Sequence, residues 1–514
     1  MTDIKSLPVA VIGAGPVGLA AAAHLVRYRQ PFVVLEAGAE AGAAIRRWGH
    51  VRMFSPWRYT IDQTAQSLLE GTGWQRPNPE ALPTGDELVD GFFAPLAQRP
   101  AIAPHVRFNA RVVSVGRKDF DKVRTKGRHE QPFAIRLASG DTVEARAVID
   151  ASGTWSQPNT AGSGGVAVAG EREHAERIAY GIPDVLSRER GRYAGKRVLV
   201  VGSGHSAFNV VLDLLTLAEQ SSCTQVTWVM RRDNLDTVWG GGASDQLAAR
   251  GELGQRAKRA FESGRLHVVT PFRIRSVVTS AASLVVHGDV NGEERSLAID
   301  QMIVCTGFRP NLDMLREVRL SIDPWLESTS TLGPLIDPNQ HSCGSVPPHG
   351  ARELTHAEKD FYIVGMKSYG RAPTFLLATG FEQARSVVAM LAGDVAAAER
   401  VELELPETGV CSTDAVTGAS SCCGTAAETV PAAAVTASSC CGASVSDAAS
   451  GGVAALVRAE SCCGGPAAEG VDACCTDDAA AKAEGKTGCG CGTERSAEAT
   501  SGREGGPLLQ IVRA

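Results

Sequence analysis

The sequence predicts an α/β protein with two Rossmann-like dinucleotide-binding domains, followed by a disordered, cysteine-rich C-terminal tail. Two glycine-rich turns, which begin at residues 13 and 202, each lie between a short apolar strand and an apolar helix. A second apolar strand follows each helix, so a β-α-β pattern occurs twice, about 190 residues apart. All 27 aromatic residues precede residue 401. A segment with so few large apolar side chains cannot offset the entropy cost of folding, which predicts the tail.

The formal net charge of −6 is divided unevenly along the 514 residues. Residues 401–514 hold 15 acidic and 6 basic side chains, and the preceding residues hold 42 and 45. Neither part has the basic excess of a nucleic-acid binder. The first residues lack a secretory signal, and no run of about 18 apolar residues offers a membrane span. We therefore expect a cytoplasmic protein that binds neither nucleic acid nor a membrane.

The first glycine-rich turn follows the apolar strand 9–12 and opens the Ala/Leu-rich helix 19–29. Gly13 makes a tight turn, Gly15 lets a phosphate approach the backbone, and Gly18 lets the helix pack against the strand. The free N–H groups at the N-terminus of the helix favour the phosphate charge. This context predicts a bound dinucleotide and makes an unoccupied glycine-rich turn the weaker alternative.

Glu36 ends the next strand, 32–36, where a carboxylate accepts hydrogen bonds from a ribose diol. Its negative charge would repel a 2′-phosphate, so the first site is expected to hold FAD or NAD and not NADP. The residues assigned to it are Gly13, Gly15, Pro16, Gly18 and Glu36.

The second turn follows strand 197–201 and precedes the helical stretch 208–218. At the end of the next strand, Arg231 and Arg232 stand where an acid would bind ribose, and guanidinium groups there suit a 2′-phosphate. The second site is therefore expected to hold NADPH and the first site FAD. The alternative is that the two arginines only solvate a strand end. The residues assigned to NADPH are Gly202, Ser203, Gly204, His205, Ser206, Arg231 and Arg232.

Further strands are predicted between and after the two units. Residues 107–115, 133–143 and 145–150 alternate or run apolar and could form a small sheet attached to the first domain, and a similar β-rich stretch covers 267–303.

Two segments, 149–159 and 302–311, are strands that end in small-residue turns. In flavoproteins with two dinucleotide-binding domains, A-T-G-x-x-x-x-P motifs of this kind mark the crossings between domains. The domain boundaries expected from this pattern are 1–165 for the first part of the FAD domain, 166–300 for the NADPH domain, 301–400 for the second part of the FAD domain and 401–514 for the tail.

In this order of motifs, residues 1–400 resemble class B flavin-dependent monooxygenases. The strings HVRMFSPW (50–57) and LPTGDELV (82–89) and the segment 342–387 are similar to bacterial flavoproteins called ArsO, which are encoded beside arsenic-resistance genes. The resemblance implies that a helix N-terminus at Thr374-Phe375-Leu376 faces the flavin, where its dipole favours negative charge on the reduced ring. The remaining expected FAD contacts are Trp48, Val113, Thr154 and Gly307.

The class B signature F-x-G-x-x-x-H-x-x-x-[YF] is matched only in part. Gly170 and His174 are in register, but Val168 and Ile178 replace the aromatic ends. Oxygenation is therefore less firmly indicated than the two cofactors.

The cysteine pattern separates three kinds of function. A disulfide reductase needs a redox cysteine pair facing the flavin, but residues 37–56 contain no cysteine and Cys223 stands alone in the second domain. The class B resemblance implies that NADPH reduces FAD, that O₂ forms a C4a-(hydro)peroxyflavin, and that oxygen passes to sulfur, nitrogen or trivalent arsenic of a small-molecule substrate. Two alternatives are an NADPH-dependent flavoprotein reductase of a metalloid or of thiols and disulfides, and a metalloid-binding protein with a vestigial flavoprotein core.

The candidate catalytic residues are chosen by their positions in the sequence. His50 and Arg52 lie where the chain after the first unit should approach the flavin ring, although each could equally serve packing or the surface. Cys343 lies near three histidines and is a candidate thiol for a soft metalloid, with an ordinary loop cysteine as the alternative.

The tail holds 11 of the 14 cysteines, several as adjacent pairs. Paired thiols suit As(III) and other thiophilic ions, so the tail is a candidate metalloid-binding arm; the alternative is low-complexity sequence without a function. The candidate ligands are Cys422, Cys423, Cys440, Cys441, Cys462, Cys463, Cys474 and Cys475.

Overall fold

The structure is a computed structural model that describes residues 4–233, 235, 238–239, 248–280, 283–341, 346–403, 480 and 482–484. The chain divides into two units, Met1–Ser420 and Ser421–Ala514. The architecture below belongs to the first unit, which contains both predicted dinucleotide sites. Most of the predicted tail, including all of its cysteines, lies outside the described residues.

A five-stranded parallel sheet lies at the centre of the first half of the architecture, with strand order β16-β7-β1-β2-β3. Its strands are β1 (Val9–Ile12), β2 (Phe32–Leu35), β3 (Val106–Arg107), β7 (Ala147–Asp150) and β16 (Phe361–Ile363). Every residue of β1, β2, β7 and β16 is buried. Continuous burial means that both faces of this sheet are covered, as in other parallel sheets.

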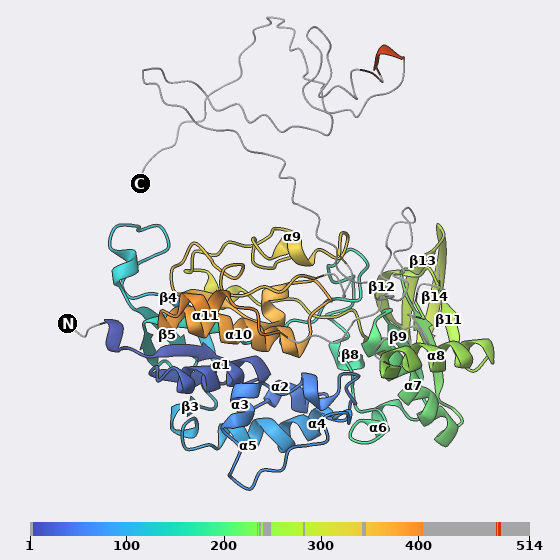
Figure 1. Cartoon of the computed structure of the whole chain (residues 1–514). Helices are drawn as coiled ribbons and strands as arrows, with labels where there is room; N and C mark the ends of the chain where they lie inside the picture. The colour runs from blue at the N-terminus through green and yellow to red at the C-terminus, as the bar shows by residue number, and fades with distance from the viewer. Residues whose placement is uncertain are drawn as a thin grey trace, which may run out of the picture. The chain divides into compact units, whose positions relative to one another are not determined.

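The alternation of side chains along β1 shows what covers each face. Val9 and Val11 belong to the hydrophobic cluster that includes helices α1 (Pro16–Arg27) and α10 (Leu377–Ala392), which pack side by side (Figure 1). Ala10 and Ile12 belong to another cluster with an antiparallel sheet on the opposite face. The strands of that sheet are β4 (Val112–Arg117), β5 (Phe133–Leu137) and β6 (Thr142–Ala145).

The second half repeats this arrangement around a parallel sheet of order β11-β10-β9-β15-β8. Helices α7 (His205–Gln220) and α8 (Ala248–Glu262) pack on one face, and an antiparallel sheet packs on the other (Figure 1). The parallel strands are β8 (Ile178–Tyr180), β9 (Arg197–Val201), β10 (Gln225–Val229), β11 (His267–Val269) and β15 (Gln301–Val304), and the antiparallel ones are β12 (Arg273–Ser280), β13 (Ser283–Val290) and β14 (Glu293–Ile299). Both β-α-β units are therefore present as expected.

Short helices complete the described part of the first unit. Their bounds are α2 (Ala43–Arg46), α3 (Gln63–Ser67), α4 (Gly85–Leu88), α5 (Ala94–Ala97), α6 (Arg190–Tyr193), α9 (Gly333–Ile336) and α11 (Val395–Glu399). Among the described residues, no helix is both long and apolar enough to cross a bilayer.

Two expectations about strands need correction. The stretch 145–150 does not form a third strand of the small sheet: β6 ends at Ala145, and residues 147–150 pair with β1 in the parallel sheet. A run of four consecutive buried residues is what a doubly covered parallel strand requires. Likewise, β15 pairs with β9, so the second parallel sheet continues to residue 304, beyond the expected boundary at 300.

The two crossing segments lie against each other. Asn159 donates its backbone N–H to the carbonyl of Gly307 at 2.9 Å, and Thr306 donates its hydroxyl to the carbonyl of Asn159 at 3.0 Å. The rings of Trp155 and Phe308 stack with centroids 4.5 Å apart. Chain segments about 150 residues apart in sequence thus form one paired connection between the two parallel sheets.

Candidate dinucleotide and flavin sites

The first glycine-rich turn has one glycine that borders open space and two that the fold itself requires. Gly13 has a φ of +100°, and a Cβ there would lie 2.8 Å from the carbonyl oxygen of Ala151. A Cβ at Gly18 would lie 2.0 Å from the carbonyl oxygen of Gly13. At Gly15, by contrast, a Cβ would meet nothing within 4 Å. Gly15 caps α1, and Pro16 is its first residue, so this space lies at the N-terminal end of a twelve-residue helix.

Glu36 follows β2 and is fixed against this turn. Its carboxylate accepts hydrogen bonds from the backbone N–H groups of Ala14 and Gly38, both at 2.7 Å. The acid therefore lies beside the space at Gly15, as a group that binds a ribose next to a pyrophosphate should. A space that a Cβ would fill, a helix N-terminus and a positioned carboxylate together fit a dinucleotide.

The predicted flavin-facing segment directly precedes α10, with Leu376 as the N-cap residue. Thr374 is buried, and its hydroxyl has no hydrogen-bond partner in the described part of the chain. The ring of Phe375 packs edge-on against Tyr369 at 5.3 Å between centroids. A buried hydroxyl without a partner is costly, and a polar edge of a bound flavin would satisfy it.

A buried ion pair that the sequence analysis missed lies at the same edge of the first sheet. The Lys367 ammonium donates to Asp150 at 2.7 Å and to the hydroxyl of Ser152 at 3.1 Å. Both charged side chains are at most 1% exposed. The Cα of Ser152 lies 3.2 Å from the Cβ position of Gly13, so the pair supports the wall of the first glycine turn. An acid at the end of the apolar run 147–150 is a sequence signal for Asp150, but no signal indicates Lys367.

The second glycine-rich turn repeats the geometry of the first. Gly202 has a φ of +128°, and a Cβ there would lie 2.4 Å from the carbonyl oxygen of Cys305. Gly204, the N-cap of α7, borders open space, because a Cβ there would meet nothing within 4 Å. Ser203 and Ser206 beside it are half-buried.

His205, the first residue of α7, contacts the ring of Phe54 from the first half of the architecture at 5.3 Å between centroids. The segment after the first dinucleotide unit therefore approaches the second glycine turn.

The two arginines follow β10. Arg231 is exposed and donates to the carbonyl of Ser163 at 3.1 Å, and Arg232 is half-buried. The side chains of both are in the described region, at the end of the strand where the sequence analysis expects the ribose phosphate. The 2′-phosphate contact itself stays a prediction.

The other expected FAD contacts differ in exposure. Thr154 is buried in the first crossing segment, and Gly307 has a φ of +86° in the second. Trp48 is half-buried and packs against the hydrophobic cluster that includes α1. Val113 lies on β4 and is 45% exposed.

The candidate catalytic residues lie in distinct environments. Both ring nitrogens of His50 are buried without a hydrogen-bond partner among the described residues. Burial lowers the pKa of His50, which the charge of Asp184 partly opposes, so the imidazole is neutral near pH 7. Arg52 is exposed, donates to the carbonyl of Leu82 and lies 3.6 Å from Glu87. Cys343 and the eight tail cysteines lie outside the described residues.

Neither cysteine that the structure describes belongs to a dithiol. Cys223 is exposed, and Cys305 is buried with its thiol donating to the carbonyl of Gly181 at 3.2 Å. Burial raises the pKa of the Cys305 thiol, which keeps it protonated and unreactive. Within the described ranges, no group of three His, Cys, Asp or Glu side chains is arranged to hold a metal ion.

The two matched positions of the class B signature lie against β12. Gly170 has a φ of +81°, and a Cβ there would lie 1.7 Å from the carbonyl oxygen of Val277 on β12. His174 is near the hydroxyl of Thr279 on the same strand, at 3.4 Å. The glycine thus allows close packing on the antiparallel sheet.

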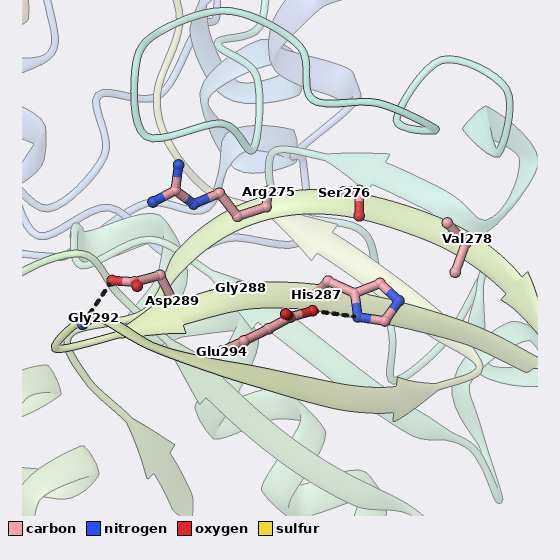
Figure 2. Close-up of a pocket in the computed structure, with 8 residues that line it drawn as sticks. All are labelled: Arg275, Ser276, Val278, His287, Gly288, Asp289, Gly292 and Glu294. Carbon is pink, nitrogen blue, oxygen red and sulfur yellow. Dashed lines mark hydrogen bonds and ion pairs between the residues drawn. The ribbon is translucent and has the colours of Figure 1, made fainter.

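Two surface cavities lie away from the glycine turns. Figure 2 shows an open depression on β12–β14 in which the side chains of Arg275, His287 and Glu294 lie on one face of the sheet. A larger cavity of about 1020 Å³ lies between α1, α3 and α10, with the buried His24–Asp62 pair in its wall. The lining of neither cavity includes a residue of the two glycine turns.

Comparison with known proteins identifies the family. Residues 10–342 match the model of the pyridine nucleotide-disulphide oxidoreductases. A ferredoxin–NADP reductase of Thermus thermophilus is 26% identical over 342 residues, which cover 66% of this chain and 84% of that protein. The indole-3-pyruvate monooxygenase YUCCA1 of Oryza sativa subsp. japonica is 31% identical over 208 residues, 40% of this chain and 44% of that one.

Solved structures share the fold at low identity. Bacillithiol disulfide reductase of Bacillus cereus gives a TM-score of 0.54 at 17% identity, covering 75% of this chain and 99% of that chain. The cadaverine monooxygenase DfoA of Erwinia amylovora gives 0.54 at 12% identity, covering 78% and 99%. With its two glycine turns at the N-terminal ends of α1 and α7, the chain belongs to the pyridine nucleotide-disulphide oxidoreductase family, and it is a flavin-dependent oxidoreductase whose cofactors are FAD and NAD(P)H.

Proposed function

We propose that the protein is an FAD- and NADPH-dependent monooxygenase that transfers one oxygen atom from O₂ to a soft nucleophile: sulfur, nitrogen or trivalent arsenic. The observation that carries this proposal is the cysteine pattern of the nucleotide-binding core. In residues 1–400 the sequence has no C-x2-C or C-x4-C pair: Cys223 is exposed, Cys305 is buried and protonated, and Cys343 lies outside the described residues. Without a cysteine pair of this kind, we expect electrons from NADPH to pass to O₂ or directly to a bound substrate.

The proposed reaction consumes NADPH, a proton, O₂ and the substrate, and yields NADP⁺, water and the oxygenated product. Bound FAD supplies the two-electron exchange and the activation of O₂. The chain's own residues then have separate tasks. Glu36 accepts hydrogen bonds from the FAD ribose, Arg231 and Arg232 bind the 2′-phosphate of NADPH, and the N-terminus of α10 with Thr374 faces the flavin. His50, neutral and without a hydrogen-bond partner among the described residues, is the proposed proton-transferring group.

Two of the compared proteins support this choice. One relative is named an indole-3-pyruvate monooxygenase, and one protein of the same fold is named a cadaverine monooxygenase. The resemblance to flavoproteins encoded beside arsenic-resistance genes makes arsenite the first nucleophile to test. The relatives named ferredoxin–NADP reductase favour a second candidate, a reductase that delivers electrons to an external acceptor.

The domain roles follow the same proposal. We assign FAD to residues 1–165 and to the part of 301–400 that follows β15, and NADPH to residues 166–300 together with β15 (Gln301–Val304), which belongs to the second sheet. The cytoplasm, where NADPH is available, is the proposed location.

The coupling of NADPH oxidation to oxygen transfer tests the monooxygenase. The FAD-loaded protein is mixed with NADPH in aerated buffer, with arsenite, a thioether or an amine, and NADPH loss, peroxide and product are measured. We expect the matching nucleophile to suppress peroxide and to give one oxygenated product per NADPH. Stoichiometric peroxide with every nucleophile would contradict the proposal, and rapid anaerobic reduction of a ferredoxin-type acceptor would favour the reductase.

Gly15 and Gly204, the glycines of the two turns that border open space, should each affect the binding of one cofactor. In the variant Gly15→Ala, the added Cβ enters the pyrophosphate space but meets no protein atom within 4 Å. We expect FAD affinity to fall about 10- to 100-fold while the apoprotein keeps its melting temperature. Gly204→Ala is the matched control, because it should weaken NADPH binding and leave the FAD content unchanged. Equal loss of both cofactors in both variants would argue against the two-site assignment.

We also propose that the paired tail cysteines bind As(III) or another thiophilic ion for the core. Serine replacement of the eight paired cysteines in the full chain is expected to lower the bound As(III) measured by equilibrium dialysis. Unchanged As(III) binding would refute this role.

A further inference from the structure

Two exposed arginines from distant parts of the chain reach the same tight loop, residues 162–166. Arg231 donates from its guanidinium to the carbonyl of Ser163 at 3.1 Å. The Nη2 atom of Arg371 lies 3.7 Å from the Cβ position of Gly165. Arg231 follows β10 in the second sheet, whereas Arg371 lies on the segment that leads into α10. The loop therefore lies between an arginine of each half of the architecture.

The loop is fixed by its own geometry. The N–H of Gly165 bonds to the carbonyl of Gly162 at 3.1 Å, and a Cβ at Gly162 would lie 2.2 Å from the carbonyl oxygen of Val166. At Gly164 a Cβ would meet nothing within 4 Å, so the tip of the loop borders open space. The Arg371 backbone is fixed as well, because its N–H donates to the carbonyl of Leu326 at 2.7 Å.

In the part of the chain that the structure describes, no carboxylate lies within 4.0 Å of the Arg231 or Arg371 guanidinium. Nearby Arg309 differs, because it is paired with Glu327. Two guanidinium groups that have no carboxylate beside them among the described residues, and that are held at one glycine-rich loop, are typical of a site for phosphate groups. Ser163 and Gly165 are two residues apart, so their Cα atoms are separated by at most about 7 Å. Two phosphate groups of one dinucleotide can be bound over such a short stretch.

We propose that Arg371 is a second phosphate contact of the nicotinamide nucleotide: it binds the pyrophosphate, while Arg231 binds the 2′-phosphate. This inference rests on the proposed NADPH site and adds a residue from the FAD-binding half to it. The pyrophosphate is then held by the N-terminus of α7 at Gly204 and by Arg371. Because Arg371 precedes the flavin-facing residue Thr374 by three positions, a bound nucleotide connects its own domain to the segment beside the flavin.

Nucleotide fragments separate the two roles. Dissociation constants for NADP⁺, NAD⁺ and adenosine 2′-monophosphate are measured by calorimetry on the oxidised, FAD-loaded full chain. Arg371→Gln is expected to weaken NADP⁺ and NAD⁺ by the same factor, about tenfold or more, and to leave adenosine 2′-monophosphate unchanged. Arg231→Gln is expected to weaken NADP⁺ and adenosine 2′-monophosphate and to leave NAD⁺ unchanged. Arg371→Lys, which keeps the charge without the planar fork, should recover part of the affinity.

Arg316→Gln is the matched control, because Arg316 is an exposed arginine, paired with Asp313, that belongs to neither glycine turn. FAD content and melting temperature show that each variant is folded. Unchanged NADP⁺ and NAD⁺ affinity in Arg371→Gln would overturn the role proposed for Arg371. The proposed NADPH site would still stand in that case, provided that the wild-type protein binds NADP⁺. If Arg371→Gln weakened NADP⁺ binding but not NAD⁺ binding, the assignment of Arg371 to the pyrophosphate would be wrong. A wild-type protein that bound no NADP⁺ would instead refute the proposed function.

Discussion

Replacing Lys367 with methionine is expected to lower the free energy of unfolding by about 3–5 kcal/mol, because the change leaves the Asp150 carboxylate buried without its cation. Asp150 is completely buried, and Lys367 donates to it at 2.7 Å and to Ser152 at 3.1 Å. The same pair supports the wall of the first glycine turn, so FAD should also dissociate more readily. Urea unfolding of the apoprotein measures the first effect, and flavin fluorescence on dilution measures the second.

A surface lysine provides the matched control for this variant. Lys118 also pairs with a carboxylate, that of Glu144, but its side chain is 46% exposed. Lys118→Met should therefore cost no more than about 1 kcal/mol. The double variant Asp150→Val/Lys367→Met, which removes both charges, should recover most of the lost stability. If Lys367→Met lowers the free energy of unfolding as little as Lys118→Met does, the buried Lys367–Asp150 pair does not stabilise the fold as proposed.

Replacing Glu358 with glutamine is expected to be comparably destabilising, by about 3–5 kcal/mol, because the change leaves two buried guanidinium groups without their carboxylate. Glu358 accepts from Arg117 Nε at 2.8 Å and from Arg128 Nη2 at 2.7 Å. All three side chains are at most 1% exposed. Arg117 ends β4 and Glu358 lies just before β16, so the cluster connects the antiparallel sheet to the edge of the parallel sheet.

The effect of Glu358→Gln should depend on pH. Burial alone would raise the pKa of Glu358, but the hydrogen bonds from Arg128 and Arg117 outweigh burial and hold it below its usual range. The ionised group therefore contributes fully above the unfolded-state pKa of about 4.3, and its contribution is lost progressively as the pH falls below that value.

The measurement is the difference in urea midpoint between wild type and Glu358→Gln from pH 7 to pH 3. We expect that difference to shrink as the pH falls below about 4.3. A difference that stayed constant over this range would show that the charge of Glu358 is not what stabilises the cluster.

The local sequence was sufficient to predict the two glycine turns and the helices that follow them. Gly18 packs against the carbonyl of Gly13 within the same turn, whereas Gly13 itself faces the carbonyl of Ala151 from a distant strand end, which the local pattern does not name. The helices opened by the two turns are present, and each begins three residues earlier than expected, at Pro16 and at His205. Most of the expected nucleotide residues could therefore be named from spacing alone, although their contacts with the cofactors stay predictions.

The sequence alone therefore determined the two β-α-β units and the glycine turns, because these follow from backbone sterics and from the period of apolar residues over short stretches. Only the tertiary structure decided which distant residues meet. Lys367 pairs with Asp150 from 217 residues away, and Arg371 reaches the loop that Arg231 also contacts. Periodicity also could not show that residues 147–150 enter the parallel sheet. Such contacts depend on how sheets and helices pack in three dimensions, and no local pattern records that packing.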